Sequence, residues 1–592
     1  MPFLNGLGKP LLVGLALREV LAPWTGHPFD FEIWVRLGVF ALSGANPYSL
    51  LPYVPHLSFA PYPWMTSISY PPLAAFVFGA TYSLYQLLGS PSQFVYYFLL
   101  KQPMVISDLL VAVLLFQLVS LKGETKSALK VARLWIYFPF AIIVSAMWGA
   151  LDPIALLLIL SSLYALEIKK PYLSASLLGL AIYLKLMPII FLPLFLISPV
   201  LLMRKKLVFA TLALGIPLIG TIAPFYLLGW DFSGIYNAVS YQGMGPGFGG
   251  MGVFNALSLL SLRTGLLTMI LSLIWLPALL TAYAYTYVKK AQLPGALLVT
   301  AILFSLFRPT MPEQWALYPI ALLLIGTREN RTQALALAGV ATAYLLVNNL
   351  LLVRFFSPVS LYAFSWDQFV DTASVFSELR YAILLVLSTL FSAEAISVVL
   401  RRPSFLSSKL NALRNVGSSQ VVTSLGYVAI VSLAGGLLDF TATKMVTDWA
   451  LAIQSNVFLG LSWLSLYHVM LVMVFEVMVV LIVLFSRRSL SDSVSLFLLL
   501  TFLNFIASAF SLILYRALEG STILSDISIY LLSSSSVTER TFVVLACTLG
   551  LLGIFYLNEI RSLLVFVFRR IDKATPNARL GPHNEDSLSA PS

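Results

Sequence analysis

Residues 207–229 read LVFATLALGIPLIGTIAPFYLLG, a run without a single charged side chain. A run of about 20 apolar residues is the length at which an α-helix crosses a hydrocarbon core of about 30 Å. Because that core holds no water, a crossing segment must satisfy its own backbone groups, and a helix does so. The basic triplet Arg204, Lys205 and Lys206 stands directly before this run, as is typical of a cytoplasmic loop.

Similar apolar runs recur along the whole chain. Of its 592 residues, 59% are hydrophobic and 10% are charged, and the mean hydropathy is +0.91. Soluble domains carry roughly 25% charged residues, so this composition is typical of an integral membrane protein. The short alternating segments of a membrane β-barrel are absent. We predict an all-α polytopic protein with about 12 to 15 transmembrane helices.

The net charge of +11 lies in short clusters between apolar runs and forms no contiguous basic domain. This distribution predicts cytoplasmic loops and argues against a nucleic-acid partner. The absence of disulfides and the polar tail favour the plasma membrane of a prokaryote or archaeon, with both termini cytoplasmic and the endoplasmic reticulum left open. The clusters divide the chain into a module over 1–400, a cytoplasmic linker over 401–420, further helices over 421–567 and a disordered tail over 568–592.

Within the first module, two loops on the opposite, extracytoplasmic side stand out. Loop 24–70 is long and rich in aromatic residues and prolines, and loop 230–256 contains the stretch YQGMGPGFGGMG. Prolines predict where helices begin and break: SYPPLAAF (69–76) places two of them at a helix start, and Pro188, Pro193 and Pro199 indicate broken helices over 172–202.

Two carboxylates, Asp30 and Glu32, open the first outer loop. A solvated loop is the plain interpretation. However, acidic residues are rare in this part of the chain, and a carboxylate at an apolar boundary is suited to act as a general base.

Four ionisable residues fall in or at the ends of apolar runs: Lys101, Asp108, Asp152 and Lys185. Such residues cost free energy in a membrane and usually face a cavity or one another. Lys101 and Asp108 are spaced to pair across two helical turns, and Lys185 has the length to reach the interface. Asp152 follows Trp148 at the outer end of a predicted span.

A late stretch, FRPTMPEQWALYPIALLLI (307–325), places Arg308, Glu313 and Gln314 on an outer turn. An outward arginine departs from the positive-inside trend, and a guanidinium matches phosphate oxygens. The four histidines show no ligand spacing, so we predict no metal site and no cofactor, with metal dependence left open. No P-loop is present either.

Taken in order, these motifs resemble the GT-C superfamily of glycosyltransferases, which use polyprenyl-phosphate sugars. The mannosyltransferases of GPI-anchor and lipid-linked glycan synthesis and their prokaryotic relatives are the most similar in pattern. The resemblance covers residues 1 to about 330 and leaves 400–592 unassigned. It rests on Asp30 followed by SGANPY (43–48), YPPL (70–73), LLKQP with SDLL (99–110), WGALDPI (148–154), YLKLMPIIFLP (183–193) and RPTMPEQWALYP (308–319).

The resemblance implies an active site on the extracytoplasmic face and an inverting transfer of a sugar, mannose first among candidates. The donor is a dolichyl- or polyprenyl-phosphate sugar, and the acceptor is a hydroxyl of a lipid-linked glycan or a lipid. Asp30 is then the general base, with Glu32 able to share that role, and Arg308 and Lys185 bind the donor phosphate. The candidate pocket residues are Trp34, Tyr48, Tyr70, Trp148, Asp152, Glu313 and Gln314.

Two other hypotheses stay open. A transporter or flippase of lipid-linked sugars would use the four intramembrane charges for substrate or coupling, although the chain shows no internal repeat. A non-catalytic subunit of a glycan assembly complex is compatible with the unassigned C-terminal helices.

Overall fold

The computed structural model describes residues 2–49, 51–59, 68–123, 125–232, 234–236, 249–255, 271–349, 355, 358 and 377–402. All of them belong to the first of the two units into which the chain divides, Met1–Val477. The predicted C-terminal helices, the tail and nearly all of the predicted linker lie outside the described residues.

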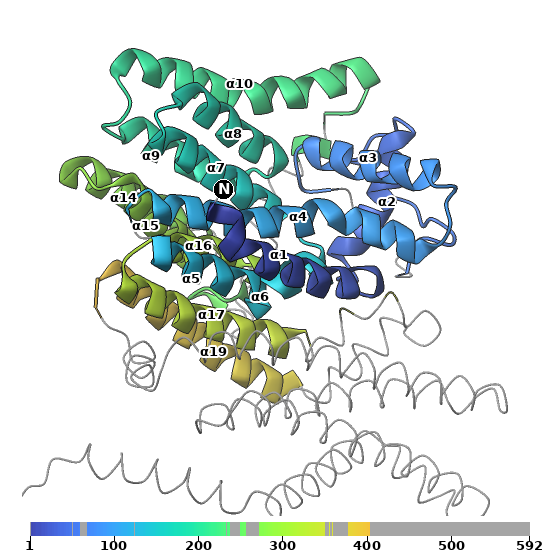
Figure 1. The fold of residues 1–592 in the computed structure, drawn as a ribbon. Helices are drawn as coiled ribbons and strands as arrows, with labels where there is room; N and C mark the ends of the chain where they lie inside the picture. The colour runs from blue at the N-terminus through green and yellow to red at the C-terminus, as the bar shows by residue number, and fades with distance from the viewer. Residues whose placement is uncertain are drawn as a thin grey trace, which may run out of the picture. The chain divides into compact units, whose positions relative to one another are not determined.

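The described chain is built from helices, with one two-stranded pairing (Figure 1). The elements are α1 (Pro2–Leu21), η1 (Ala22–Trp24), α2 (Asp30–Leu42), α3 (Leu73–Leu87), α4 (Gln93–Ser120), α5 (Thr125–Ile136), α6 (Pro139–Ile142), the π-helical η2 (Ile143–Trp148), α7 (Asp152–Glu167), α8 (Pro171–Leu184), η3 (Met187–Phe191), α9 (Leu192–Ile197), α10 (Met203–Leu228), β1 (Gly249–Gly250), α14 (Trp275–Lys289), α15 (Leu293–Phe307), β2 (Thr310–Met311), η4 (Glu313–Ala316), α16 (Leu317–Leu324), α17 (Arg328–Asn348) and α19 (Ser377–Val399).

This architecture confirms the all-helical class. Among the described residues, α4 and α10 are each long and apolar enough to cross a membrane, and α5 with Pro139–Trp148 forms a third candidate, bent by 49°. These helices indicate a membrane-associated protein. The larger number of crossings stays a prediction.

Several apolar helices are short because prolines and glycines begin or end them. Helices α7 and α8 have 16 and 14 residues, which corresponds to roughly 21–24 Å and is less than a full crossing. Each begins with proline in its first turn. The predicted break over 172–202 is confirmed, since the chain there forms α8, η3 and α9 in succession.

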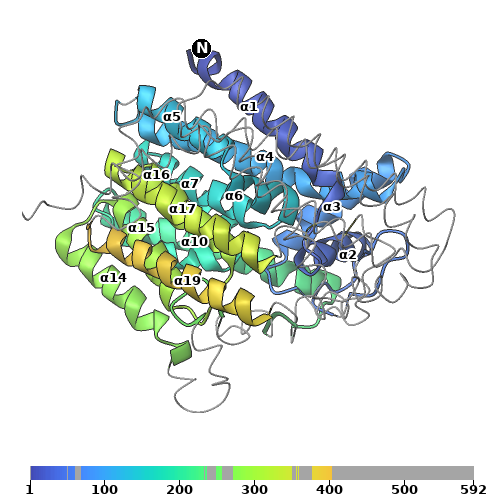
Figure 2. The same ribbon diagram turned by 90° about the horizontal axis from the view of Figure 1, so that it is seen from below.

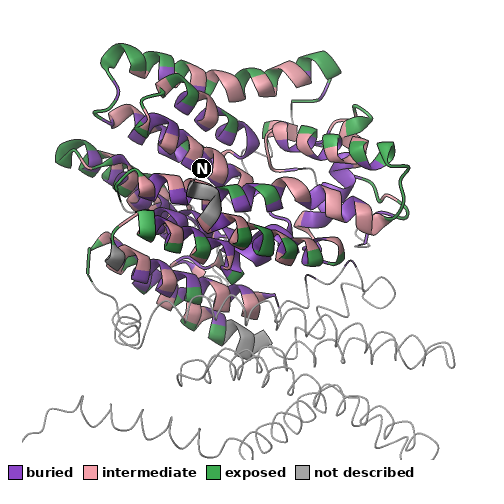
Figure 3. Cartoon of the chain, viewed as in Figure 1, coloured by how far each residue is buried: buried purple, intermediate pink, exposed green. Residues whose placement is uncertain are grey.

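Helix α4 lies at the centre of the packing and contacts α1, α3, α5 and α7. From α7 the contacts continue through α8 to α10, whose outer surface is exposed and apolar (Figure 3). Helices α17 and α19 pack side by side, as both ribbon views show (Figure 1, Figure 2). An exposed apolar helix such as α10 is what a lipid-facing position requires.

Loops that the charge pattern places on the same side of the membrane lie together. On the predicted cytoplasmic side, Lys122 donates to the carbonyl of Ile325 at 2.8 Å, and Arg331 donates to Ser127. At the opposite helix ends, β1 and β2 pair in parallel, Gly249 with Thr310 and Gly250 with Met311. This pairing attaches the glycine-rich loop to the turn that follows Arg308.

Candidate active site

Seven polar, charged or aromatic side chains of the candidate site lie at or next to the ends of helices. Asp30 opens α2, Trp148 closes η2, Asp152 opens α7 and Lys185 follows α8. The others are Arg308 after α15, Trp315 in η4 and Tyr318 in the first turn of α16. Helix ends carry unsatisfied backbone groups and partial charges, so a site built on them is polar even where its helices are apolar.

Asp30 keeps part of its carboxylate accessible, with 27% of the side chain exposed. The indole nitrogen of Trp148 donates a 2.8 Å hydrogen bond to Asp30 Oδ2. His27 Nδ1 lies 3.9 Å from the same oxygen, but it accepts hydrogen bonds from the backbone nitrogens of Phe29 and Asp30. An imidazole nitrogen that accepts carries no proton, so this geometry favours a neutral His27. Asp30 therefore has a partly exposed carboxyl group that the hydrogen bond from Trp148 orients.

Lys185 and Asp152 form a buried ion pair, with Nζ 2.7 Å from Oδ1 and each side chain 1% exposed. Tyr318 donates its hydroxyl to the same carboxylate oxygen at 2.9 Å. Lys185 also lies within electrostatic range of Asp30 and Arg308. Lys185 thus interacts electrostatically with both the predicted base and the second predicted donor-binding cation.

Arg308 and Lys185 both contact the ring of Trp315. The guanidinium carbon of Arg308 lies 4.2 Å from the ring centroid, and Lys185 Nζ lies 5.3 Å from it. Trp315 itself stacks on Phe304, with 5.3 Å between ring centroids. A cation over an aromatic face is attracted by the ring quadrupole, so Trp315 holds two positive groups near each other at modest cost.

The predicted aromatic residues line the same region. Trp34 donates its indole hydrogen to the carbonyl of Gly149 at 3.1 Å, and its ring lies 5.3 Å from that of Tyr70. Tyr48 donates its hydroxyl to the carbonyl of Tyr70 at 2.8 Å. The ring of Tyr70 in turn lies 5.7 Å from Lys185 Nζ. Trp34, Tyr48 and Tyr70 therefore connect the first outer loop to the ion-pair cluster.

Glu32 occupies a different environment from Asp30, although both lie in the first turn of α2. Its carboxylate is fully buried. Oε1 accepts a hydrogen bond from Arg36 Nε at 2.6 Å, and Oε2 accepts one from the backbone nitrogen of Phe59 at 3.0 Å. Arg36 also donates to the carbonyl of Leu51 at 3.1 Å. Burial raises the pKa of the Glu32 carboxyl above its usual value, and the Arg36 guanidinium acts in the opposite direction. These contacts hold the loop over 51–59.

The two polar residues of η4 are both buried at 6% exposure. Glu313 accepts a hydrogen bond from the amide of Asn348 in α17. Gln314 Oε1 makes no hydrogen bond to the part of the chain that the structure describes. The role of Gln314 in the substrate pocket stays a prediction.

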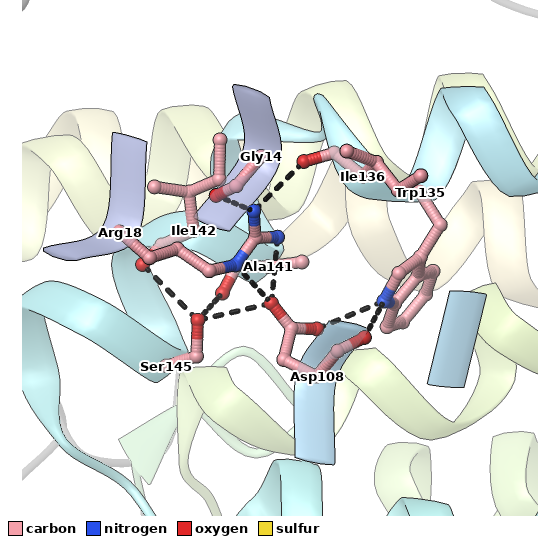
Figure 4. A network of polar contacts seen from close by, with 8 residues as sticks. All are labelled: Gly14, Arg18, Asp108, Trp135, Ile136, Ala141, Ile142 and Ser145. Atoms are coloured by element: carbon pink, nitrogen blue, oxygen red, sulfur yellow. Dashed lines mark hydrogen bonds and ion pairs between the residues drawn. The ribbon is translucent and has the colours of Figure 1, made fainter. Parts of the chain in front are cut away.

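The predicted pairing of Lys101 with Asp108 is wrong. Asp108 is fully buried and pairs with Arg18 of α1, with 2.7 Å between Oδ2 and Nη2 (Figure 4). Trp135 and Ser145 donate to the same carboxylate at 2.8 and 3.0 Å. Helix α1 contacts α4, so the guanidinium of Arg18 lies close enough to form the ion pair with Asp108. Lys101 instead donates to Thr25, Ala146 and Met147.

Two site residues were missed from the sequence. His27 stacks on Trp148, with 4.7 Å between centroids and 15° between planes, and Tyr318 binds Asp152. His27 stands in the predicted outer loop 24–70 and Tyr318 in the stretch 307–325, but neither is marked by charge or spacing. The signal for Tyr318 is its place at a helix start directly after the outer turn.

The backbone around Arg308 is fixed by the glycine-rich loop. Met251 donates to the carbonyl of Met311 at 3.1 Å, and Val253 donates to the carbonyl of Leu306 at 3.2 Å. Gly250 has a φ of 76°, and a Cβ there would lie 2.0 Å from the carbonyl oxygen of Met311. Only glycine fits that approach.

Among the described residues, no group of three or more His, Cys, Asp or Glu side chains is arranged to hold a metal ion. Compared with models of known protein families and with curated protein sequences, the chain matches none.

Proposed function

We propose that this protein is a membrane glycosyltransferase that moves a sugar, mannose first among candidates, from a dolichyl- or polyprenyl-phosphate donor to a hydroxyl of a glycan or lipid acceptor on the extracytoplasmic face. The observation that carries the proposal is the cluster of Asp30, Lys185 and Arg308. It combines a partly exposed carboxylate with two buried cations that lie beside a shared aromatic ring. A base and an anion site in mutual range are what transfer from a phosphate-linked donor needs.

In the proposed reaction, the Asp30 carboxylate accepts the proton of the acceptor hydroxyl. The acceptor oxygen forms a bond to the anomeric carbon, while the bond from that carbon to the phosphate oxygen breaks with inversion. The polyprenyl phosphate leaves with one more negative charge than the phosphodiester carried. Because that charge develops in the transition state, a fixed cation beside it lowers the barrier more than it strengthens donor binding.

We assign the base to Asp30 and a structural role to Glu32. A general base must reach the substrate proton directly or through one water. The carboxylate of Asp30 is 27% exposed, whereas that of Glu32 is fully buried, with each oxygen engaged by a donor.

The transporter hypothesis uses intramembrane charges as coupling groups. Lys101 and Asp108 are both fully buried, and each makes several hydrogen bonds. A coupling residue must exchange protons or substrate, and burial behind several partners opposes that. This favours the enzyme hypothesis, which needs neither residue to move.

The two functions are separated by following the sugar of a labelled donor. Purified protein is reconstituted in liposomes with synthetic polyprenyl-phosphate sugar labelled in the sugar, alongside lipid and glycan acceptors. The proposed function predicts label in an acceptor through a glycosidic bond of inverted configuration. Movement of the intact donor across the bilayer, without a new bond, would contradict it and support the transporter.

A further inference from the structure

The ammonium of Lys101 is enclosed by neutral oxygens in the interior of the helices. The side chain is fully buried, and Nζ lies 2.7 Å from the carbonyl of Ala146, 3.2 Å from that of Met147 and 3.0 Å from Thr25 Oγ1. It also donates to the Thr25 carbonyl, and it lies 4.7 Å from the ring centroid of Phe31. A buried amino group costs free energy unless it is hydrogen-bonded, and here its contacts satisfy backbone and hydroxyl oxygens of two separate segments.

The carbonyl groups at the C-terminal end of η2 need hydrogen-bond donors from outside the helix. A helix end leaves its last carbonyls without partners in the helix, and a π-helical end leaves one more. Here the missing donors come from elsewhere in the chain. The carbonyls of Ala146 and Met147 accept from Lys101, that of Trp148 accepts from the His27 backbone, and that of Gly149 accepts from Trp34.

The two segments that Lys101 joins are the two that form the environment of Asp30. Thr25 leads through His27 into Asp30 at the start of α2. Ala146 and Met147 lead directly to Trp148, whose indole donates to Asp30. Thr25 Oγ1 also donates to the Ala146 carbonyl at 3.2 Å, so the two segments are in direct contact as well.

We propose that Lys101 is a positioning residue for Asp30: its ammonium fastens the Trp148 end of the π-helical segment to the chain that leads into Asp30. The catalytic consequence rests on the proposed function. Without the ammonium, the buried carbonyls of Ala146 and Met147 lose donors, and the segment rearranges to find others. Trp148 then no longer holds the Asp30 carboxylate in one orientation.

The first test observes Trp148 directly and needs no substrate. The full-length protein is labelled with 5-fluorotryptophan, and its ¹⁹F spectrum is recorded in detergent. Trp148→Phe assigns the resonance, and Asp30→Ala gives its position without the hydrogen bond. In Lys101→Met, the resonance is expected to move by more than half of that difference. Lys205→Met, at an exposed lysine, is the matched control and should leave the resonance at the wild-type position.

The second test measures transfer. Lys101→Met is expected to lower kcat about tenfold with the donor KM within about twofold of wild type, because geometry is lost rather than binding. A folded Lys101→Met protein whose Trp148 resonance and kcat match wild type would overturn the inference. If Lys101→Met does not fold, Lys101→Gln is measured instead, because its amide retains an N–H donor. The shift of the Trp148 resonance and the loss of kcat are then expected to be smaller. Absence of transfer by wild type would overturn the proposed function alone, since the resonance still decides the role of Lys101.

Discussion

Lys185 Nζ lies 2.7 Å from Oδ1 of Asp152, although 33 residues separate them in the chain. Helices α7 and α8 pack against each other in consecutive order, so the start of the first meets the end of the second. The pair fixes a cation beside Trp315, whose ring Arg308 also contacts. One cation of the proposed anion site, Lys185, is therefore positioned by the ends of a packed helix pair, whereas Arg308 lies in the turn that follows α15.

Breaking this ion pair should destabilise the protein. Asp152→Asn leaves Lys185 buried without a carboxylate, and removal of one partner of a buried pair costs about 3–5 kcal/mol. We expect a clearly lower Tm in detergent. The double variant Asp152→Leu/Lys185→Met should lose less than Asp152→Asn, since no unpaired charge remains. Equal Tm values for wild type and Asp152→Asn would contradict this interpretation.

Arg308 should act on the donor. Arg308→Ala is expected to lower kcat/KM for the polyprenyl-phosphate sugar by about 100-fold, since it removes a cation beside the developing phosphate charge. The acceptor KM should change little. Arg204→Ala removes an exposed arginine at the start of α10 and serves as the control. Equal losses toward donor and acceptor in steady-state kinetics would argue against a phosphate role.

The contact between the glycine-rich loop and the Arg308 turn gives a further prediction. In Gly250→Ala, the new Cβ meets the Met311 carbonyl at a φ that L-residues rarely adopt, so β1 and β2 separate. We expect about a tenfold loss of kcat/KM for the donor, because Arg308 is displaced. Gly295→Ala is the matched change, since open space surrounds that position in α15. Identical donor kinetics for the two variants would show that the pairing does not position Arg308.

The parts of the site that the sequence predicts are those marked by charge at a predicted membrane boundary. Asp152 and Lys185 stand out because a charge within an apolar run is costly. Asp30 stands out because acidic residues are rare around it, and Arg308 because it departs from the positive-inside trend. The structure pairs Asp152 with Lys185, places Arg308 and Lys185 beside Trp315, and brings Asp30 within electrostatic range of Lys185. Their function stays a prediction, since their proximity is geometry and the reaction is chemistry.

The parts that the sequence could not predict depend on which helices pack together. Spacing along α4 favours a Lys101–Asp108 pair, but Arg18 on a separate helix takes the aspartate. Glu32 resembles Asp30 in composition and position, yet the direction of each side chain from α2 separates a buried ion pair from an exposed carboxylate. The π-helical turn at Ile143–Trp148 has no sequence signal. Its last carbonyl groups accept hydrogen bonds from Lys101 and from the His27 backbone, which lie in other parts of the chain.

The proposed role of Asp30 as the base of a sugar transfer can be tested by comparing four proteins in one transfer reaction. Purified full-length wild type, Asp30→Asn, Glu32→Gln and Glu167→Gln are compared for transfer of radiolabelled mannose from synthetic polyprenyl-phosphate mannose. Glu167 is exposed at the end of α7, so its variant controls for the loss of a carboxylate.

We expect Asp30→Asn to lower kcat by at least about 100-fold. Glu167→Gln should transfer the sugar near the wild-type rate. Glu32→Gln should do so too, once the rate is calculated per folded molecule, because Glu32 has a structural role. Transfer by Asp30→Asn at the wild-type rate, or no transfer by wild type across a panel of donors and acceptors, would contradict the account.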